Sequence, residues 1–240
     1  MFVVNRQRGP THIILLIVSR KQHKSRTPTR RSFGTDDLGR RLRLARDSKG
    51  VTVRGLARQI DVSPSLVSQI ERGRVMPSVG TLFAIVTALD LFVDDLFRGG
   101  DRRAKPHADA AAPRAKATPV QRPHNRKAIR LAKGVRWERL TPTSDQDAEF
   151  MYLVYDVGAA SCQVDSLIRH GGKEYGFIIS GRLGVRIGFD EFELHPGDSL
   201  SFDAQTPHRL WTIGKKPVAA VWVVLNRHGD ARSPRAASSS

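Results

Sequence analysis

The sequence has little of what a secreted or membrane-spanning protein needs. It contains a single cysteine, Cys162, so no disulfide can form within one chain. Disulfide frameworks belong to oxidising compartments, and their absence is consistent with a reducing cytoplasm. The apolar runs IILLIV at residues 13–18 and VAAVWVVL at residues 218–225 both fall far short of the ~20 apolar residues that a membrane-spanning helix requires. We therefore expect a cytoplasmic protein that does not cross a membrane.

Acidic residues are also scarce, and the resulting positive charge is unevenly distributed. The chain holds 40 Lys and Arg against 23 Asp and Glu, a formal net charge of +17. Residues 1–35 contain no acidic residue, residues 99–127 are strongly basic, and residues 128–228 are balanced. Basic segments of this kind attract polyanions without reading their sequence. Charge therefore indicates a nucleic acid partner but does not identify the part that reads it.

Changes in composition divide the 240 residues, which are enough for two modest domains. Residues 1–33 are expected to be a disordered basic arm, and residues 34–98 show helical periodicity. Residues 99–127 are rich in Ala, Pro and Arg without apolar periodicity, as in a flexible linker. Residues 128–228 alternate apolar and polar positions between Gly and Pro turns, which predicts an all-β barrel or sandwich. Residues 229–240 are expected to be a disordered tail.

The helical segment is predicted to contain five helices, at residues 38–50, 53–60 and 64–73, from residue 78 onward, and at 93–97. Thr52 and Ser63 stand where they can cap the second and third helices, and Pro64 suits the first position of the third. The three residues DVS separate these two helices, and Ala57 is small enough for a close crossing. Two short helices joined by such a turn are typical of a helix-turn-helix.

The stretch LARQIDVSPSLVSQIERGRVMPSVGTLFAIVTAL resembles the xenobiotic response element (XRE) family of phage-repressor-like DNA-binding domains. Asp61 stands where the turn usually has glycine, and Asp tolerates a left-handed backbone better than most residues. In such a domain the third helix enters the major groove, where Gln69 can bond adenine bidentately and serines discriminate weakly. The residues expected to contact DNA are Arg54, Ser63, Ser65, Ser68, Gln69, Arg72 and Arg74, with the arginines on phosphates.

The strand-rich segment resembles the cupin family, whose barrel is a double-stranded β-helix. In RHGGKEYGFIISG, His170, Glu174 and Gly181 match the second histidine, the glutamate and the glycine of the first cupin motif. The second motif appears as PGDSLSFDAQTPH, with His208 as its histidine. Ile168 stands where the first motif has its other histidine. The resemblance therefore implies a cupin fold with one metal ligand missing.

Two hypotheses are open for the site that these motifs imply. His170, Glu174 and His208 are expected to converge inside the barrel, and imidazole with carboxylate suits one divalent metal ion. Alternatively, the apolar side contributed by Ile168 favours an organic effector that hydrogen-bonds to the same side chains. The residues predicted for an effector pocket are His170, Glu174, Tyr175, His208 and Trp211, with Phe177 and Trp222 as apolar lining if they point inward.

Together the two segments are similar to the XRE–cupin transcriptional regulators of bacteria. This resemblance implies a sequence-specific DNA-binding regulator of an operon, not an enzyme, whose cupin domain senses a small-molecule effector, dimerises, or does both. The expected partners are a double-stranded DNA operator, the effector and a second copy of the chain. One alternative is a metal-dependent cupin dioxygenase or isomerase with a DNA-binding appendage, and another is an architectural DNA binder. Since the linker is expected to be structureless, a signal should pass through pairing of the barrels.

Overall fold

In the computed structural model, the described residues are 35–97, 118–145 and 147–225. The arm predicted at residues 1–33, most of the linker predicted at 99–127 and the tail predicted at 229–240 lie outside these ranges. Their predicted disorder therefore stays a prediction. Among the described residues, no helix is long and apolar enough to cross a membrane.

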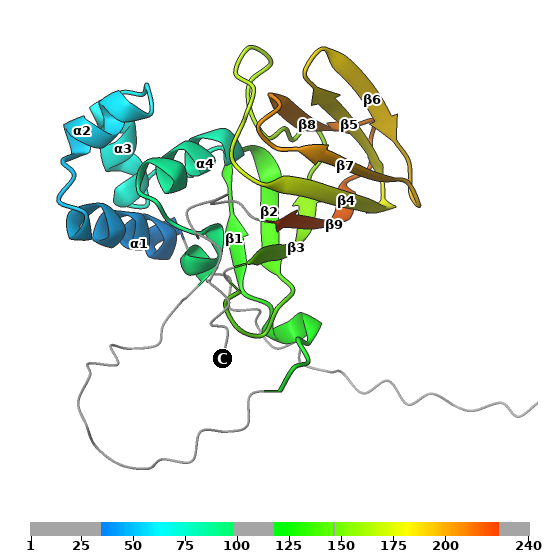
Figure 1. Cartoon of the computed structure of the whole chain (residues 1–240), viewed down its shortest axis with the longest axis horizontal. Coiled ribbons are helices and arrows are strands. Elements are labelled where there is room, and N and C mark those ends of the chain that lie inside the picture. The colour runs from blue at the N-terminus through cyan, green and yellow to red at the C-terminus, as the bar shows by residue number, and fades with distance from the viewer. Residues whose placement is uncertain (1–34, 98–117, 146, 226–240) are drawn as a thin grey trace, which may run out of the picture. The chain divides into compact units, whose positions relative to one another are not determined.

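The N-terminal part contains four α-helices (Figure 1). Their bounds are α1 Thr35–Ser48, α2 Val53–Gln59, α3 Pro64–Glu71 and α4 Val79–Ala88. The Thr52 side chain accepts a hydrogen bond from Gly55 N at 2.9 Å, and the Ser63 side chain accepts one from Leu66 N at 3.2 Å. These caps satisfy amide groups that have no partner inside α2 and α3. Both caps confirm the prediction from the sequence.

The turn between α2 and α3 has the geometry of a helix-turn-helix. Asp61 adopts a left-handed backbone with φ of 53°, so the residue in place of the usual glycine accepts the conformation that the turn requires. Val62 N donates to Ala57 O at 2.9 Å and closes the end of α2. Ala57 is buried, and its small side chain allows the two helices to pack closely.

The prediction of a fifth α-helix is wrong. Residues 93–97 form a 3-10 helix, η1 Val93–Phe97. Asp90 has φ of 50°, so the chain turns sharply after α4 and leaves a short segment. The tighter 3-10 form is common in segments of this length. Leu96 and Phe97 are buried, so η1 still closes the core of the helical part.

A buried ion pair fixes α3 against α1. Arg46 Nε donates to Glu71 Oε1 at 2.6 Å, and Arg46 Nη2 donates to Glu71 Oε2 at 2.9 Å. The two parallel bonds hold the planar groups in one orientation. Arg46 also donates to Val51 O at 2.7 Å, so it ties α1 to the chain that leads into α2.

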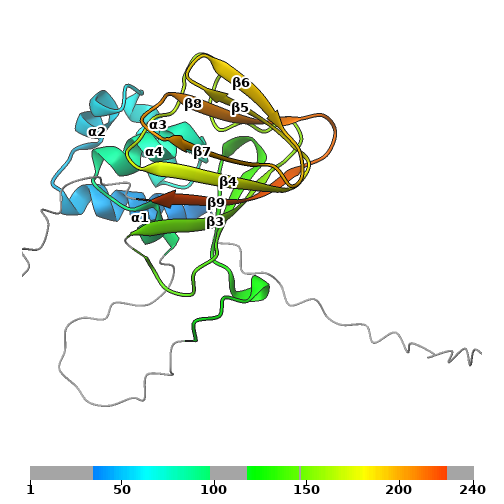
Figure 2. The same cartoon turned by 45° about the vertical axis from the view of Figure 1, so that its right-hand side comes forward.

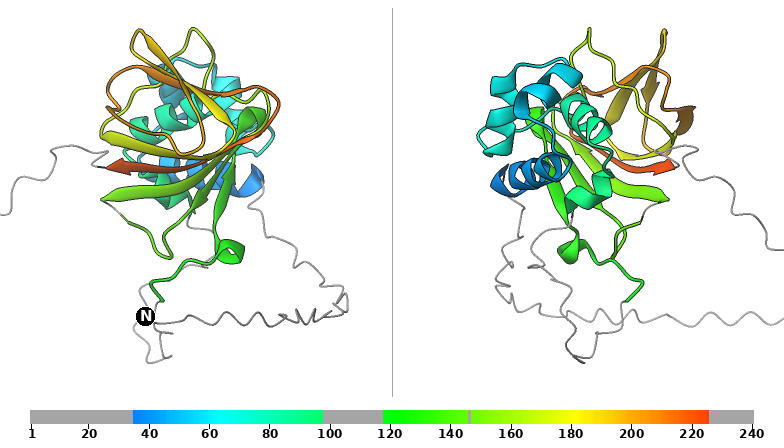
Figure 3. Two further views of the ribbon diagram at one scale, coloured as in Figure 1. Left: turned by 90° about the vertical axis from the view of Figure 1, so that its right-hand side faces the viewer. Right: turned by 60° about the vertical axis from the view of Figure 1, so that its left-hand side comes forward.

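The C-terminal part folds into two antiparallel sheets (Figures 2 and 3). Its elements are η2 Pro123–Asn125, β1 Ala128–Arg130, η3 Ala132–Gly134, β2 Val135–Arg139, β3 Ala148–Tyr155, β4 Lys173–Ser180, β5 Arg182–Ile187, β6 Asp190–Leu194, β7 Ser199–Asp203, β8 His208–Ile213 and β9 Val218–Leu225. The six-stranded sheet has the order β1-β2-β3-β9-β4-β7, and the three-stranded sheet has the order β6-β5-β8. The three-stranded sheet lies over the six-stranded one (Figure 3). This arrangement agrees with the predicted cupin-like fold.

Strand β9 shows how side chains are distributed between the two faces of the larger sheet. It pairs with β3 on one side and with β4 on the other. Along it, buried Trp222 and Val224 alternate with partly exposed Val221 and Val223. Successive residues of a strand point to opposite faces. Trp222 and Val224 therefore point into the interior between the sheets, and this interior holds the candidate site.

Candidate functional site

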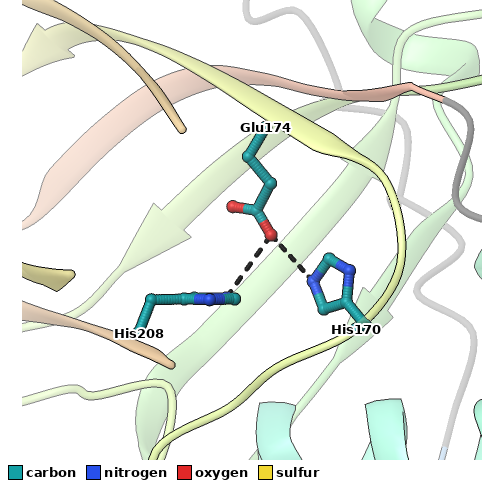
Figure 4. A group of neighbouring side chains, drawn as sticks. All are labelled: His170, Glu174 and His208. Atoms are coloured by element: carbon teal, nitrogen blue, oxygen red, sulfur yellow. Dashed lines mark ion pairs between the residues drawn. The ribbon is translucent and has the colours of Figure 1, made fainter. Parts of the chain in front are cut away.

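Three buried polar side chains lie together between the sheets (Figure 4). Glu174 lies on β4, His208 begins β8, and His170 lies in the segment before β4. Glu174 Oε1 is 2.8 Å from His170 Nε2 and 3.4 Å from His208 Nε2. The ligand atoms that the three residues offer all lie within 4.8 Å of one another. The structure thus brings together the residues that the two cupin-like motifs supply.

The hydrogen bonds of the two imidazoles show which nitrogen of each ring carries a hydrogen and which one presents a lone pair to Glu174. His170 Nδ1 is 2.9 Å from Gly171 O, and His208 Nδ1 is 2.9 Å from Thr206 O. A carbonyl oxygen can only accept, so each Nδ1 carries the hydrogen. In the neutral rings both Nε2 lone pairs then face a carboxylate, and His170 Nε2 makes no hydrogen bond. This arrangement is repulsive unless a proton or a metal cation lies between the groups, and metal-ligating histidines commonly bond a backbone carbonyl in this way.

The charge states support the same reading. Burial alone would raise the pKa of Glu174, but its contacts with His170, His208 and Trp222 outweigh burial and hold the pKa below its usual value. Trp222 Nε1 donates to Glu174 Oε2 at 2.7 Å, so Oε1 is left to the histidines. Burial lowers the pKa of His208 by more than the negative charge of Glu174 raises it. The attraction that lowers the Glu174 pKa needs a positive charge between the carboxylate and the imidazoles, which a shared proton or a divalent ion would supply.

A cavity of about 20 Å³ adjoins the cluster. Its lining residues are Val79, Phe83, Trp137, Met151, Leu153, Tyr155, Ser161, Ile168, Glu174, His208, Leu210, Trp222 and Val224. Ile168 is among them, so the apolar side expected from the missing histidine is present. A space of this size holds one water molecule or one ion. With its walls in this position, the cavity has no room for an organic molecule.

Three aromatic residues considered for the pocket do not line it. Tyr175 follows Glu174 on β4, so it points to the outer face, where 38% of it is exposed. Phe177 lies on the same outer face. Trp211 is three residues after His208 on β8 and also points outward, with the Arg209 guanidinium carbon 4.8 Å from its ring centre. The predictions of Tyr175 and Trp211 as pocket residues are therefore wrong.

Phe83, Trp137, Tyr155 and Ser161 line the cavity although the sequence did not single them out. Trp137 on β2 and Tyr155 on β3 point inward by the same alternation that places Glu174 there. Burial raises the pKa of Tyr155, so its hydroxyl stays neutral. Phe83 lies on α4, where the apolar run LFAIV gives no sign that one ring leaves the helical core.

The side chains predicted to contact DNA lie on and around α3. Ser65 and Arg72 are exposed, and Ser68 and Gln69 are partly exposed on the same helix. Gln69 Nε2 donates to Ser65 Oγ at 3.2 Å, so the amide already has a fixed direction on the helix surface. Arg54, Ser63 and Arg74 are also exposed, around the ends of α2 and α3. This surface presents four neutral hydrogen-bonding side chains flanked by three arginines.

Two family models match the chain. Residues 37–98 match the model of a helix-turn-helix domain, and residues 151–224 match the model of a cupin domain. The chain is 36% identical over 58 residues to YazB of Bacillus subtilis (strain 168), named an uncharacterized HTH-type transcriptional regulator. That match covers 24% of this chain and 84% of YazB.

Two further comparisons extend this similarity. The chain is 35% identical over 60 residues to y4dL of Sinorhizobium fredii (strain NBRC 101917 / NGR234), also named an uncharacterized HTH-type transcriptional regulator. The match covers 25% of this chain and spans only 31% of y4dL. The crystal structure of an HTH_3 family transcriptional regulator from Vibrio cholerae is 20% identical, with a TM-score of 0.56. It covers 80% of this chain and 96% of the other, which shows a common fold.

Proposed function

The chain belongs to the family of HTH-type transcriptional regulators and carries a cupin domain, and from this premise we propose that it is a sequence-specific, dimeric regulator of a bacterial operon. In this proposal α3 reads the operator, and the pocket around Glu174 senses a ligand. The observation that carries it is the exposed surface of α3, where Ser65 and Gln69 are flanked by arginines. Neutral hydrogen-bonding groups reach base edges in the major groove, and arginines hold phosphates.

A second copy of the chain is proposed to pair through the outer face of the six-stranded sheet. Across β3, β9 and β4, Phe150 is paired with Val223, and Val223 with Tyr175, in one continuous row. In the next row Val221 joins Tyr152 to Phe177, which is 47% exposed. Apolar rows that face solvent are typical of protein interfaces. A two-fold dimer would place two copies of α3 on an inverted repeat with half-sites about one helical turn, ~34 Å, apart.

Selection from a pool of random duplexes tests the proposed function. The full chain should enrich an inverted repeat with defined half-sites, and sedimentation should give a dimer at the working concentration. An architectural binder would enrich no consensus, because it binds the backbone and not the base edges. A monomer that binds an asymmetric site at full affinity would contradict the dimeric reading.

Gln69→Ala is expected to weaken binding to the selected operator by ~1–3 kcal/mol and to relax the preference at one base position. The reason is the loss of a bidentate base contact. Arg72→Ala should weaken binding to all sequences alike and reduce the salt dependence, because its expected contact is a phosphate. The measurement is anisotropy titration of operator and scrambled duplexes at several salt concentrations. Identical selection profiles for the two variants would contradict the assigned roles.

The pocket fits a divalent metal ion. His170 and His208 would hold it through their Nε2 atoms, and Glu174 through Oε1. Glu174 Oε1 lies 2.8 Å from His170 Nε2 and 3.4 Å from His208 Nε2. A bound ion would remove the repulsion between lone pairs and carboxylate described above. When bound, the ion would supply Lewis-acid chemistry. This capacity is what favours the alternative function as a metal-dependent enzyme. The cavity of about 20 Å³ leaves no room for an organic substrate beside the ion while its walls stay in place.

A further inference from the structure

Helix α4 of the DNA-reading part forms one side of the cavity between the sheets. The Phe83 ring stacks on the His170 ring, with centroids 4.3 Å apart and an interplanar angle of 22°. The same ring lies 5.4 Å from the Trp137 ring. Gly80 N, one turn before Phe83, donates to Ser161 O at 3.2 Å. One wall of the pocket therefore comes from the helical bundle that presents α3.

The helical part has a second attachment to the strands, at η1. Asp94 forms a buried ion pair with Arg139 of β2 at 3.3 Å and accepts from Asp145 N at 3.2 Å. Val93 N donates to Glu149 Oε1 at 3.1 Å. Breaking a buried charged network is costly because it leaves charges without partners. The attachment at α4 consists of ring packing and two backbone hydrogen bonds, the one at Gly80 and a second from Ala132 N to Pro77 O at 2.9 Å, two residues before the helix. These contacts are uncharged, so the attachment is the weaker of the two.

We propose that α4 is the movable wall of the pocket and that an organic effector enters by displacing Phe83. The inference rests on the proposed regulatory function and names how the pocket is linked to α3. With α4 in place the cavity of about 20 Å³ admits one ion, and a larger ligand needs space from a wall. The strands are held by continuous hydrogen-bonded ladders. Space is therefore gained at α4, which pivots about the ion pair of Asp94 and Arg139.

The displacement of α4 is expected to change the affinity for the operator in one direction. With Phe83 in place, Ser65 on α3 and Arg72 at its C-cap are exposed, so this form is free to bind DNA. It also holds the reading helix at a fixed position on the barrel, and so at a fixed spacing from its copy in the dimer. An organic effector that displaces α4 releases this constraint and lowers operator affinity, and the operator lowers effector affinity by the same factor. The signal thus reaches α3 directly as well as through pairing of the barrels.

A cysteine at position 80 reports whether α4 is docked. A Cβ atom built on Gly80 lies 3.4 Å from the Cys162 Cβ, close to the ~3.5–4.5 Å of disulfides. Cys162 is the single native cysteine, so in Gly80→Cys each of the two thiols has one intrachain partner. Oxidised glutathione takes the two electrons and two protons released as the S–S bond forms. Mass spectrometry under denaturing conditions measures the rate, and Gly80→Ser is the matched control without a second thiol.

In this test, a substitution that overfills the pocket takes the place of the unidentified effector. Val224 lines the cavity, and Val224→Phe adds on the order of 50 Å³ of side chain, more than the free space. In the Gly80→Cys chain it should slow disulfide formation by about tenfold or more and weaken operator binding by about tenfold. Val157→Phe is the control, because Val157 is 55% exposed and away from the pocket. Adding Phe83→Ala should restore the rate of disulfide formation and the operator affinity to within about twofold of the Gly80→Cys parent.

The outcomes separate this inference from the proposed function. Failure of Gly80→Cys to form the disulfide, or an unchanged rate with Val224→Phe, overturns the movable wall. If Val224→Phe does not fold alone, rescue of folding and cross-linking by Phe83→Ala supports the wall, and no rescue overturns it. The disulfide rate involves no DNA, so it stands even if random duplexes yield no consensus. If a consensus is selected but Val224→Phe leaves the rate of disulfide formation unchanged, the proposed regulatory function stands and the proposal of a movable α4 is overturned.

Discussion

The Glu174→Ala, His208→Ala double variant is expected to lose affinity for a divalent ion by more than a factor of about 100. Substituting outer-sphere partners of a metal ligand already costs about 10–100-fold in affinity, and this variant removes two of the three proposed ligands. Zn²⁺ titration by calorimetry, on protein first treated with a chelator, measures the loss. Any response of operator binding to the pocket ligand should disappear with it. Operator affinity without ligand should stay within about twofold, a difference of ~0.4 kcal/mol.

A matched control for this variant lies on the surface of the same barrel. Glu193 and His195 form a Glu–His pair at 3.6 Å on and just after β6, with 39% and 58% of their side chains exposed. Glu193→Ala, His195→Ala removes the same chemical groups from a site without burial. It should leave Zn²⁺ affinity unchanged. Equal Zn²⁺ affinity in the wild type and the Glu174→Ala, His208→Ala variant would show that the ion binds elsewhere.

The helical part could be predicted closely because its signals are local. Thr52 and Ser63 specify helix starts by accepting hydrogen bonds from residues three positions away, and Pro64 suits the first position of α3 because it needs no N–H there. Asp61 adopts the left-handed backbone of the turn because its own short polar side chain tolerates that conformation. The exception is the segment 93–97, where the length of the helix depends on the turn at Asp90 and on packing against the rest of the chain.

The aromatic lining of the pocket is predicted less well from the sequence than the helical part. If Glu174 points inward on a strand, Tyr175 must point outward, because side chains alternate. The same parity turns Trp211 away when His208 points inward, and it turns Trp137 and Tyr155 toward the interior. The two cupin-like motifs placed the polar residues correctly. For the aromatic residues near those motifs, strand parity decides which side chains face the interior.

The role of Phe83 could not have been predicted from the sequence. Its stacking on His170 joins positions 87 residues apart in number, across a segment without periodicity. An apolar face of α4 has two possible uses, the core of the helical bundle or a contact with another part, and periodicity does not distinguish them. The expectation that a signal passes through pairing of the barrels follows from a structureless linker at residues 99–127. The packing of α4 against the strands is a contact between the two parts that does not depend on the linker.

Deleting residues 2–33 is expected to reduce affinity for nonspecific duplex DNA on the order of a thousandfold at ~0.1 M salt. Residues 1–33 contain eight Lys and Arg and no acidic residue. Each cation that neutralises a phosphate contributes ~0.9 to the slope of log affinity against log salt. If about half of the eight do so, the slope falls by roughly 3.5. Titration of a scrambled duplex between 50 and 200 mM salt, conditions chosen for the assay, measures both quantities.

The selected consensus should not change when this arm is removed, because base reading is assigned to α3 and charge alone carries no sequence information. The matched control keeps the full length and replaces the eight Lys and Arg by Gln, which separates charge from chain length. Both variants should give the same slope. A lost base preference in the deletion that the Gln variant retains would mean that the arm reads the minor groove through uncharged groups. A preference lost in both would assign that reading to its arginines, and in either case α3 would not be the sole reader.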